Sequence, residues 1–286
     1  MTCIWTLGEI EAQRDVRYHR TPEGRLHTEE QARAFVDEVG FCYLFGDQGV
    51  EIPTLWAAIC GSRRPVSDDH DDADMGRTWN WKDTLPARGE LYYGKLLRNK
   101  PTLVSLALLP IFYALSPNYG DVEDYLLQYE EGQLSVEAKN VYEALLNEGA
   151  MATSRLRVVA GLAGVGATAR RFDNALTELQ AEMKIAKVGI SDASSWGYAY
   201  VYDLFLRRYP EVPAAARAIS TDDAMEALLL RYLRNVVAVP VANAQRLFRW
   251  DEWEWERLIA RLGKRGAIRA DVGVQGLRGP CLVLEG

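Results

Sequence analysis

The order of predicted elements between Ser135 and Leu206 constrains the fold more than any single residue does. Apolar residues recur at helical spacing in three successive segments, each after a residue able to cap a helix. Two segments rich in β-branched and aromatic residues follow, joined by a turn at 191–197. The predicted helices are 135–149, capped by Ser135, a short one from Thr153 or Ser154 to Ala160, and a third capped by Thr168; the predicted strands are 184–190 and 198–203.

Three helices followed by a β-hairpin are the plan of a winged helix. A second copy is predicted near the C-terminus, with helices at 222–236 and 241–248, a helix from the capping box 251–254 to Gly263, and a hairpin of 267–274 and 280–284. The N-terminal third follows a similar order, with a helix from the capping box 28–31 to Gly40, helices at 53–59 and 78–85, and strands 90–97 and 102–106 around the turn 98–101.

The predicted fold class is α+β, mainly helical, with two or three tandem winged-helix units. The 286 residues exceed the roughly 100–200 residues typical of one domain, which favours several modules with modest cores. The predicted segments are a divergent N-terminal winged-helix-like unit at 28–107, a helical connector at 108–132, the middle winged helix at 133–209 and the C-terminal winged helix at 221–286.

The net charge of −7 argues against an indiscriminate polyanion binder, because non-specific DNA affinity comes mainly from phosphate neutralisation. The charge is uneven along the chain. Residues 1–132 carry 13 Lys and Arg against 22 Asp and Glu, net −9, whereas 133–209 and 210–286 each carry +1. A nucleic-acid surface is therefore expected as a local patch in the last two thirds of the chain.

The start of the sequence lacks the basic region and cleavage site of a signal peptide, and no apolar run reaches the roughly 20 residues that span a bilayer. We therefore expect a cytoplasmic protein. The four cysteines, Cys3, Cys42, Cys60 and Cys281, form no C-x-x-C pair, and we expect them to be reduced thiols.

Three stretches of sequence resemble a known family: Val39–Phe45, Gly76–Lys82 together with Tyr92–Lys95, and Arg171–Leu179. Over most of residues 28–286 the chain resembles the winged-helix DNA glycosylases that unhook interstrand crosslinks, the AlkZ/YcaQ-like family, and in particular its shorter AlkZ-related members. The resemblance implies tandem winged helices and DNA as a partner. The β-rich C-terminal domain of the glycosylases is not expected in this chain.

One pair of positions departs from that family. In the glycosylases, the segment similar to 40–45 carries a polar pair, Gln-x-Gln or Gln-x-Asp, that positions the attacking water; the resemblance puts Tyr43 and Phe45 there. Phenylalanine can neither orient nor deprotonate water, and a tyrosine hydroxyl is a poor base at neutral pH. The sequence leaves open whether the chain is an enzyme, and the candidate activity is hydrolysis of N-glycosidic bonds.

The middle unit carries the residues that we expect to contact DNA. Basic side chains on the second and third helices would bind phosphates, two lysines flank the hairpin, and a tryptophan in its turn would stack on a base or enter the minor groove. The alternative is that these charges are solvated and the tryptophan packs on its own hairpin. The residues are Arg155, Arg157, Arg170, Arg171, Lys184, Lys187 and Trp196.

Two further sets of residues are candidates for other sites. Tyr43, Trp79, Trp81 and Tyr92 would line a base pocket, although aromatic residues at such spacing often belong to a core. In the acidic loop 68–74, His70 or Asp72 is a candidate catalytic base. The loop lacks an EF-hand pattern, so we predict no metal site, and acidic loops are usually solvated.

The leading hypothesis is a DNA-binding protein linked to DNA repair or damage tolerance, with double-stranded or damaged DNA as its partner, no membrane and no cofactor. Two alternatives stay open. One is a divergent DNA glycosylase that acts on alkylated or crosslinked bases. The other is a protein-interaction scaffold, for which the partner is another protein.

Overall fold

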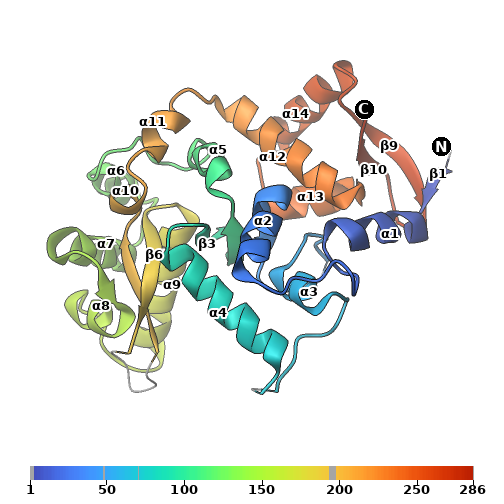
Figure 1. The fold of residues 1–286 in the computed structure, drawn as a ribbon. Helices are drawn as coiled ribbons and strands as arrows, with labels where there is room; N and C mark the ends of the chain where they lie inside the picture. The colour runs from blue at the N-terminus through green and yellow to red at the C-terminus, as the bar shows by residue number, and fades with distance from the viewer. Residues whose placement is uncertain (1–2, 48, 70, 193–197, 286) are drawn as a thin grey trace. The chain divides into compact units, whose positions relative to one another are not determined.

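The computed structural model describes residues 3–47, 49–69, 71–192 and 198–285 (Figure 1). The fold is α+β, as the sequence predicts, and helices account for about half of the chain. Contacts between residues divide the chain into two units. We call residues 1–81 with 221–286 the terminal unit, and residues 82–220 the central unit.

The middle part of the central unit follows the predicted order of helices and strands (Figure 1). Its short first strand pairs with the last one, so the antiparallel sheet has the order β5-β7-β6. The core lies between this sheet and the helices, where Phe172 and Leu179 pack with Val141 and Leu145. The elements are α7 (Val136–Glu148), β5 (Met151–Ala152), α8 (Thr153–Val159), α9 (Ala167–Ala181), β6 (Ile185–Ser191) and β7 (Ala199–Leu204).

The helix starts in this segment agree only in part with the predicted caps. The Ser135 hydroxyl accepts a hydrogen bond from the Ala138 amide at 3.2 Å, as predicted. The second helix is preceded by Ala152 rather than by Thr153 or Ser154. The third begins after Gly166, whose φ of 63° is a left-handed conformation that glycine adopts without strain. Thr168 therefore lies within the helix instead of capping it.

The rest of the central unit contains the predicted hairpin of β3 (Tyr92–Leu97) and β4 (Lys100–Val104), which are antiparallel. Helix α4 (Ala73–Ala87) runs from the terminal into the central unit and is longer than the predicted 78–85. The remaining helices are η1 (Leu106–Leu108), α5 (Leu109–Tyr113), α6 (Asp124–Glu130), α10 (Phe205–Arg208) and α11 (Val212–Ala216).

In the terminal unit, a four-stranded sheet of order β1-β9-β10-β8 combines both ends of the chain. Its first strand and the helix after it were not predicted, although Thr6 and Glu9 form a capping box there. The predicted capping box that starts at Thr28 is confirmed. In the one predicted at 251–254, the Asp251 side chain makes no capping hydrogen bond. The elements are β1 (Cys3–Thr6), α1 (Leu7–Arg17), α2 (Glu29–Val39), β2 (Phe41–Tyr43), α3 (Leu55–Cys60), α12 (Thr221–Val236), β8 (Ala238–Pro240), α13 (Val241–Phe248), α14 (Glu252–Lys264), β9 (Ile268–Gln275) and β10 (Cys281–Leu284).

Cys42, Cys60 and Cys281 are free thiols, as predicted. Across the residues that the structure describes, no helix combines the length and the apolar character needed to cross a membrane.

Candidate functional site

Four of the predicted DNA-contact residues lie on α8 and α9 of the central unit. Arg170 and Arg171 are the fourth and fifth residues of α9, and both are exposed. Arg155 is an exposed residue of α8, and Arg157 on the same helix is half-buried. These two successive helices therefore carry all four guanidinium groups at or near their surface.

Three of these arginines pair with carboxylates of the same unit. Exposed ion pairs are worth about 0–1 kcal/mol, so a phosphate group is able to compete for the guanidinium. Arg155 Nη2 donates to Glu148 at 2.6 Å, Arg157 Nη2 to Asp173 at 3.4 Å, and Arg171 Nε to Glu137 at 2.6 Å.

The two predicted contact lysines require a correction, because the structure buries both. Lys184 is 4% exposed and its Nζ donates to Asn118 Oδ1 at 2.7 Å. Lys187 is 1% exposed and pairs with Asp83. Neither ammonium group is open to a DNA phosphate. The predicted Trp196 lies outside the described residues.

Lys187 belongs to a cluster of charged and phenolic groups, which we call the lysine–aspartate cluster (Lys82, Asp83, Lys187, Tyr198 and Tyr200). Its three charged residues are buried, whereas Tyr198 is 39% exposed. Lys82 Nζ donates to Asp83 Oδ1 at 2.7 Å and to the hydroxyls of Tyr198 and Tyr200 at 2.9 and 3.0 Å. The Tyr198 hydroxyl donates to the other Asp83 oxygen at 2.6 Å. The Lys187 ammonium lies 4.0 Å from the centre of the Tyr200 ring.

Burial and neighbouring charges shift the pKa values of two groups in this cluster. Burial lowers the pKa of Lys187 to about 8, and the neighbouring Lys82 charge acts in the same direction. Burial would raise the pKa of Asp83, but the Lys187 charge and the hydrogen bonds to the carboxylate hold it below its usual value. With both lysines charged, the cluster holds two positive groups and one negative group. Deprotonation of Lys187 makes the cluster neutral.

A cavity of about 400 Å³, which we call the tyrosine cavity, lies next to this cluster. Tyr200 of the cluster lines it, and so does Tyr93, whose ring lies against the Lys187 ammonium group. Residues from β3, α8, α9 and β7 line it, so every wall belongs to the central unit. Its volume falls in the range of small-molecule sites. The lining consists of Tyr93, Lys95, Thr153, Arg157, Phe172, Asp173, Leu176, Gln180, Tyr200 and Tyr202.

Two polar side chains of the tyrosine cavity have unusual environments. Gln180 is 2% exposed and its Nε2 donates to the Leu176 carbonyl at 2.9 Å, but its Oε1 is buried without a hydrogen-bond partner. Lys95 Nζ donates to Thr177 Oγ1 at 2.8 Å, and burial lowers the pKa of this lysine, while Asp173 opposes the shift. The cavity thus combines aromatic side chains with a cation.

The four residues predicted to line a base pocket have different surroundings. Tyr43, Trp81 and Tyr92 are core residues, exposed by at most 5%, whereas Trp79 is 45% exposed. Tyr92 packs against the rings of Phe205 and Tyr209. Because side chains alternate along a strand, the next residue, Tyr93, reaches the tyrosine cavity in its place.

Tyr43 and Phe45 are the residues at the two positions where the resemblance led us to expect a polar pair. Tyr43 is fully buried, and its amide donates to the Pro53 carbonyl at 3.0 Å. The Phe45 ring lies about 6 Å from the rings of Trp56 and Trp79, with centroid distances of 6.1 and 6.2 Å. Phe45, Trp56 and Trp79 thus form an aromatic packing cluster of the terminal unit, and neither Tyr43 nor Phe45 carries a carboxylate or amide group.

Asp72, one of the two candidate bases, has a structural role. Its Oδ1 accepts hydrogen bonds from the Asp74 and Met75 amides at 2.9 and 3.1 Å, which caps the start of α4, and its carboxylate pairs with Arg64. His70 lies outside the described residues. Among the residues that are described, no group of three or more histidines, cysteines and carboxylates is arranged to hold a metal ion.

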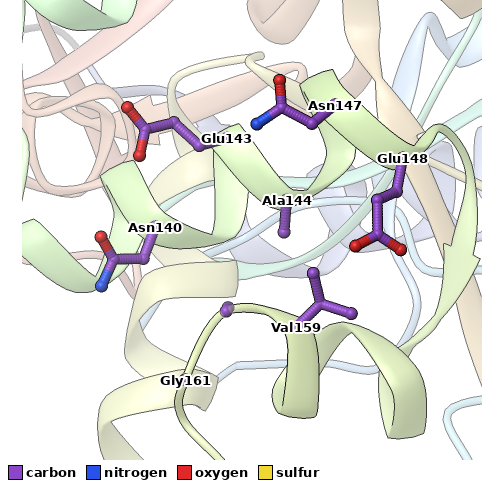
Figure 2. A pocket seen from close by; sticks show the side chains of 8 residues that line it. Asn140, Glu143, Ala144, Asn147, Glu148, Val159 and Gly161 are labelled. Atoms are coloured by element: carbon purple, nitrogen blue, oxygen red, sulfur yellow. The ribbon is translucent and has the colours of Figure 1, made fainter.

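A second hollow of about 360 Å³ lies between α7 and the end of α8 (Figure 2). Figure 2 shows the Glu148 side chain at the end of α7 pointing toward α8, which carries Val159. Asn140 and Glu143 lie nearer the start of α7. Glu143 accepts from Lys139 Nζ at 2.7 Å. Because carboxylates repel phosphate, this hollow is poorly suited to contact the DNA backbone.

Alternating tyrosines in the second strand of the predicted hairpin are a sequence signal for part of the tyrosine cavity. Tyr200 and Tyr202 alternate along β7, so they point to one face of the sheet, and Tyr198 directly precedes the strand. Their rings are neighbours, with centroid distances of 5.4 and 6.2 Å. For Gln180 and Lys95 no local pattern distinguished a cavity residue from an ordinary helix or strand residue.

Comparisons with known proteins agree with the resemblance noted in the sequence. No curated protein matches the chain. Among solved structures, the Streptomyces sahachiroi DNA glycosylase AlkZ matches with a TM-score of 0.56 at 15% sequence identity, over 98% of this chain and 70% of the glycosylase. This likeness establishes a shared fold. The family described as AlkZ related matches residues 26–249, and the chain therefore belongs to the AlkZ-related family.

Proposed function

We propose that this protein binds DNA through the α8–α9 surface of its central unit and acts in DNA repair or damage tolerance. The observation that carries the proposal is the set of four arginines on one helix-turn-helix, with Arg170 and Arg171 exposed near the start of α9. The start of such a helix, with its free amides and basic side chains, is suited to phosphate contacts. The AlkZ structure, described as a DNA glycosylase, makes DNA the expected partner of the shared fold.

The proposal includes winged-helix units at 133–209 and 221–286. Both segments have the order helix, strand, helix, helix and hairpin, and in both the first strand pairs with the last, as β5-β7-β6 and β8-β10-β9. A divergent unit at 28–107 and a connector at 108–132 remain predictions.

The far end of α9 is less available to DNA than its start. Lys95 of β3 donates to Thr177 on this helix, and α9 contributes four residues to the walls of the tyrosine cavity. We therefore propose that the arginines near the start of α9 make the phosphate contacts. Double-stranded or damaged DNA is the proposed ligand.

We propose further that the protein does not hydrolyse glycosidic bonds by way of a polar pair at positions 43 and 45. Tyr43 is fully buried and Phe45 packs among tryptophans, so neither side chain supplies a base for water. Binding without this reaction would suit a protein that recognises or protects a lesion.

A salt titration of binding to a labelled duplex tests the proposal, using the wild type and an Arg170→Ala/Arg171→Ala variant. We expect affinity to fall as salt rises, and the double variant to bind more weakly with a salt slope reduced by about 2. Arg257→Ala/Arg265→Ala, which removes two arginines that are about half exposed in the terminal unit, is the matched control. Absence of binding at low salt, or an unchanged slope in the α9 variant, would overturn the proposal.

A further inference from the structure

Two basic side chains from different elements line the tyrosine cavity, Lys95 of β3 and Arg157 of α8. The side chains of Arg157 and Asp173 are 33% and 64% exposed, so a ligand from solution is able to reach this side of the cavity. Asp173 pairs with Arg157 at 3.4 Å, and its charge also opposes the fall in the pKa of Lys95. The two cations therefore lie around the same carboxylate.

Both cations are held in place with most of their hydrogen-bonding capacity unused. Lys95 Nζ donates to Thr177 Oγ1 at 2.8 Å, and the Thr177 hydroxyl donates in turn to the Asp173 carbonyl. The Arg157 guanidinium carbon lies 4.7 Å from the centre of the Phe172 ring, and its Nη2 donates to Asp173. An ammonium group has three N–H donors and a guanidinium group has five. Among the described residues each cation has one such acceptor, so donors remain for a ligand.

Further positive charge lies behind the tyrosines of the cavity. The Lys187 ammonium is 4.8 and 4.0 Å from the ring centres of Tyr93 and Tyr200, which both line the cavity. Its lysine–aspartate cluster has one excess positive charge, because two lysines share one carboxylate. The two lining cations and Asp173 have another. These four positive and two negative groups give a net charge of +2, which favours an anion in a site of low dielectric constant.

A phosphate group matches this site in charge and in shape. It carries nearly two negative charges at pH 7, and it accepts hydrogen bonds from both guanidinium and ammonium groups. Four elements surround the cavity, so it is concave. A phosphate attached at one side only is able to enter such a site, whereas an internal phosphodiester would have to bring the chain past both of its sides.

We propose that the tyrosine cavity binds a phosphate dianion between Lys95 and Arg157. The phosphate is either free in solution or the terminal phosphate of a DNA strand. The inference goes beyond the proposed function, because the cavity holds a phosphate group whether or not the α8–α9 surface binds a duplex.

Calorimetric titration of the full chain with inorganic phosphate, at constant ionic strength, tests the site without DNA. We expect Lys95→Met, which keeps an unbranched side chain but removes the charge, to weaken phosphate binding about tenfold. Asp173→Asn removes the carboxylate that competes for Arg157 and should strengthen binding by up to about fivefold, a gain that misfolding does not produce. Lys100→Met, at an exposed position of the same β3–β4 hairpin, is the matched control and should bind phosphate as the wild type does.

Anisotropy measurements with a labelled duplex whose 5′ ends carry either a phosphate or a hydroxyl group distinguish the two sources. A preference for the phosphorylated duplex that Lys95→Met loses would identify the end of a DNA strand; phosphate binding with equal affinity for both duplexes would identify phosphate from solution. The inference would be overturned by phosphate affinity or a duplex preference that Lys95→Met leaves unchanged, by weaker phosphate binding in Asp173→Asn, or by the absence of both phosphate binding and a preference. Affinity for the hydroxyl-ended duplex measures the proposed function separately.

Discussion

The ammonium group of Lys187 and the carboxylate of Asp83 form an ion pair in the interior of the central unit, although 104 positions separate them in the sequence. Both side chains are nearly inaccessible to solvent, at 0% and 6% exposure. The same carboxylate accepts a hydrogen bond from Lys82, so one buried negative charge compensates two buried ammonium groups. The stability of the central unit therefore depends on Asp83.

We expect Asp83→Asn to destabilise the protein by about 3–5 kcal/mol, because removing one partner leaves uncompensated buried charge. Chemical denaturation followed by tyrosine and tryptophan fluorescence would measure this as a lower transition midpoint. Glu130→Gln removes one charge from an exposed position of the same unit and should shift the midpoint by less than about 0.5 kcal/mol. Equal midpoints for the two variants would contradict the role assigned to Asp83.

The buried lysines predict a stability that depends on pH. Burial lowers the pKa of Lys187 and of Lys184 to about 8, from an ordinary value of 10.5 in the unfolded chain. Between these values the unfolded chain binds more protons, so the free energy of unfolding should rise as pH rises from about 8 to 10, by roughly 1–2 kcal/mol for each lysine. Above pH 10 the effect reverses, because burial raises the pKa of tyrosines such as Tyr92 above that of the unfolded chain.

Denaturation midpoints measured from pH 7 to 10 would check this dependence. Lys187→Met should flatten the rise, since it removes one of the groups that release a proton and leaves Lys82 paired with Asp83. Lys139→Met, at a partly exposed position of α7, is the control and should keep the wild-type slope. A midpoint that stays constant over this range in the wild type would refute the proposed linkage.

Glu137 restrains one of the arginines proposed to bind DNA, since it accepts from Arg171 Nε at 2.6 Å. Glu137→Gln should raise the affinity for a duplex by about two- to fivefold at low salt, because it frees Arg171 and removes a charge that repels phosphate. Glu256→Gln, an exposed change of the same kind in the terminal unit, should leave affinity nearly unchanged. Weaker binding of the Glu137 variant would argue against a phosphate contact by Arg171.

The expected replacement of a polar pair by Tyr43 and Phe45 leads to a prediction about chemistry. Incubation of the protein with duplexes that contain alkylated or crosslinked bases should give no more abasic sites than incubation without protein, because neither residue is able to activate water. Alkali-induced strand cleavage measures the abasic sites. Base release above background would mean that other groups of the chain carry out the hydrolysis, and the divergent glycosylase would then be the better description.

The sequence alone determined most of the local structure. Caps and helical periodicity predicted α2, α7 and α12, and the hairpins β3–β4, β6–β7 and β9–β10 all occur near the predicted residues. These features depend on neighbours within a few positions, so the pattern of capping, apolar and turn residues contains the required information. The resemblance in three short stretches also identified the family correctly.

Only the tertiary structure decided which polar residues are buried and what they face. Strand 184–190 alternates imperfectly, and a lysine at position 187 is ordinarily expected in solvent. It lies inside because Asp83, far away in the sequence, compensates its charge. Likewise, the tyrosine cavity joins β3, α8, α9 and β7, and nothing local marks Gln180 as one of its lining residues. Long-range packing sets burial and charge compensation, so a pattern of nearest neighbours does not contain them.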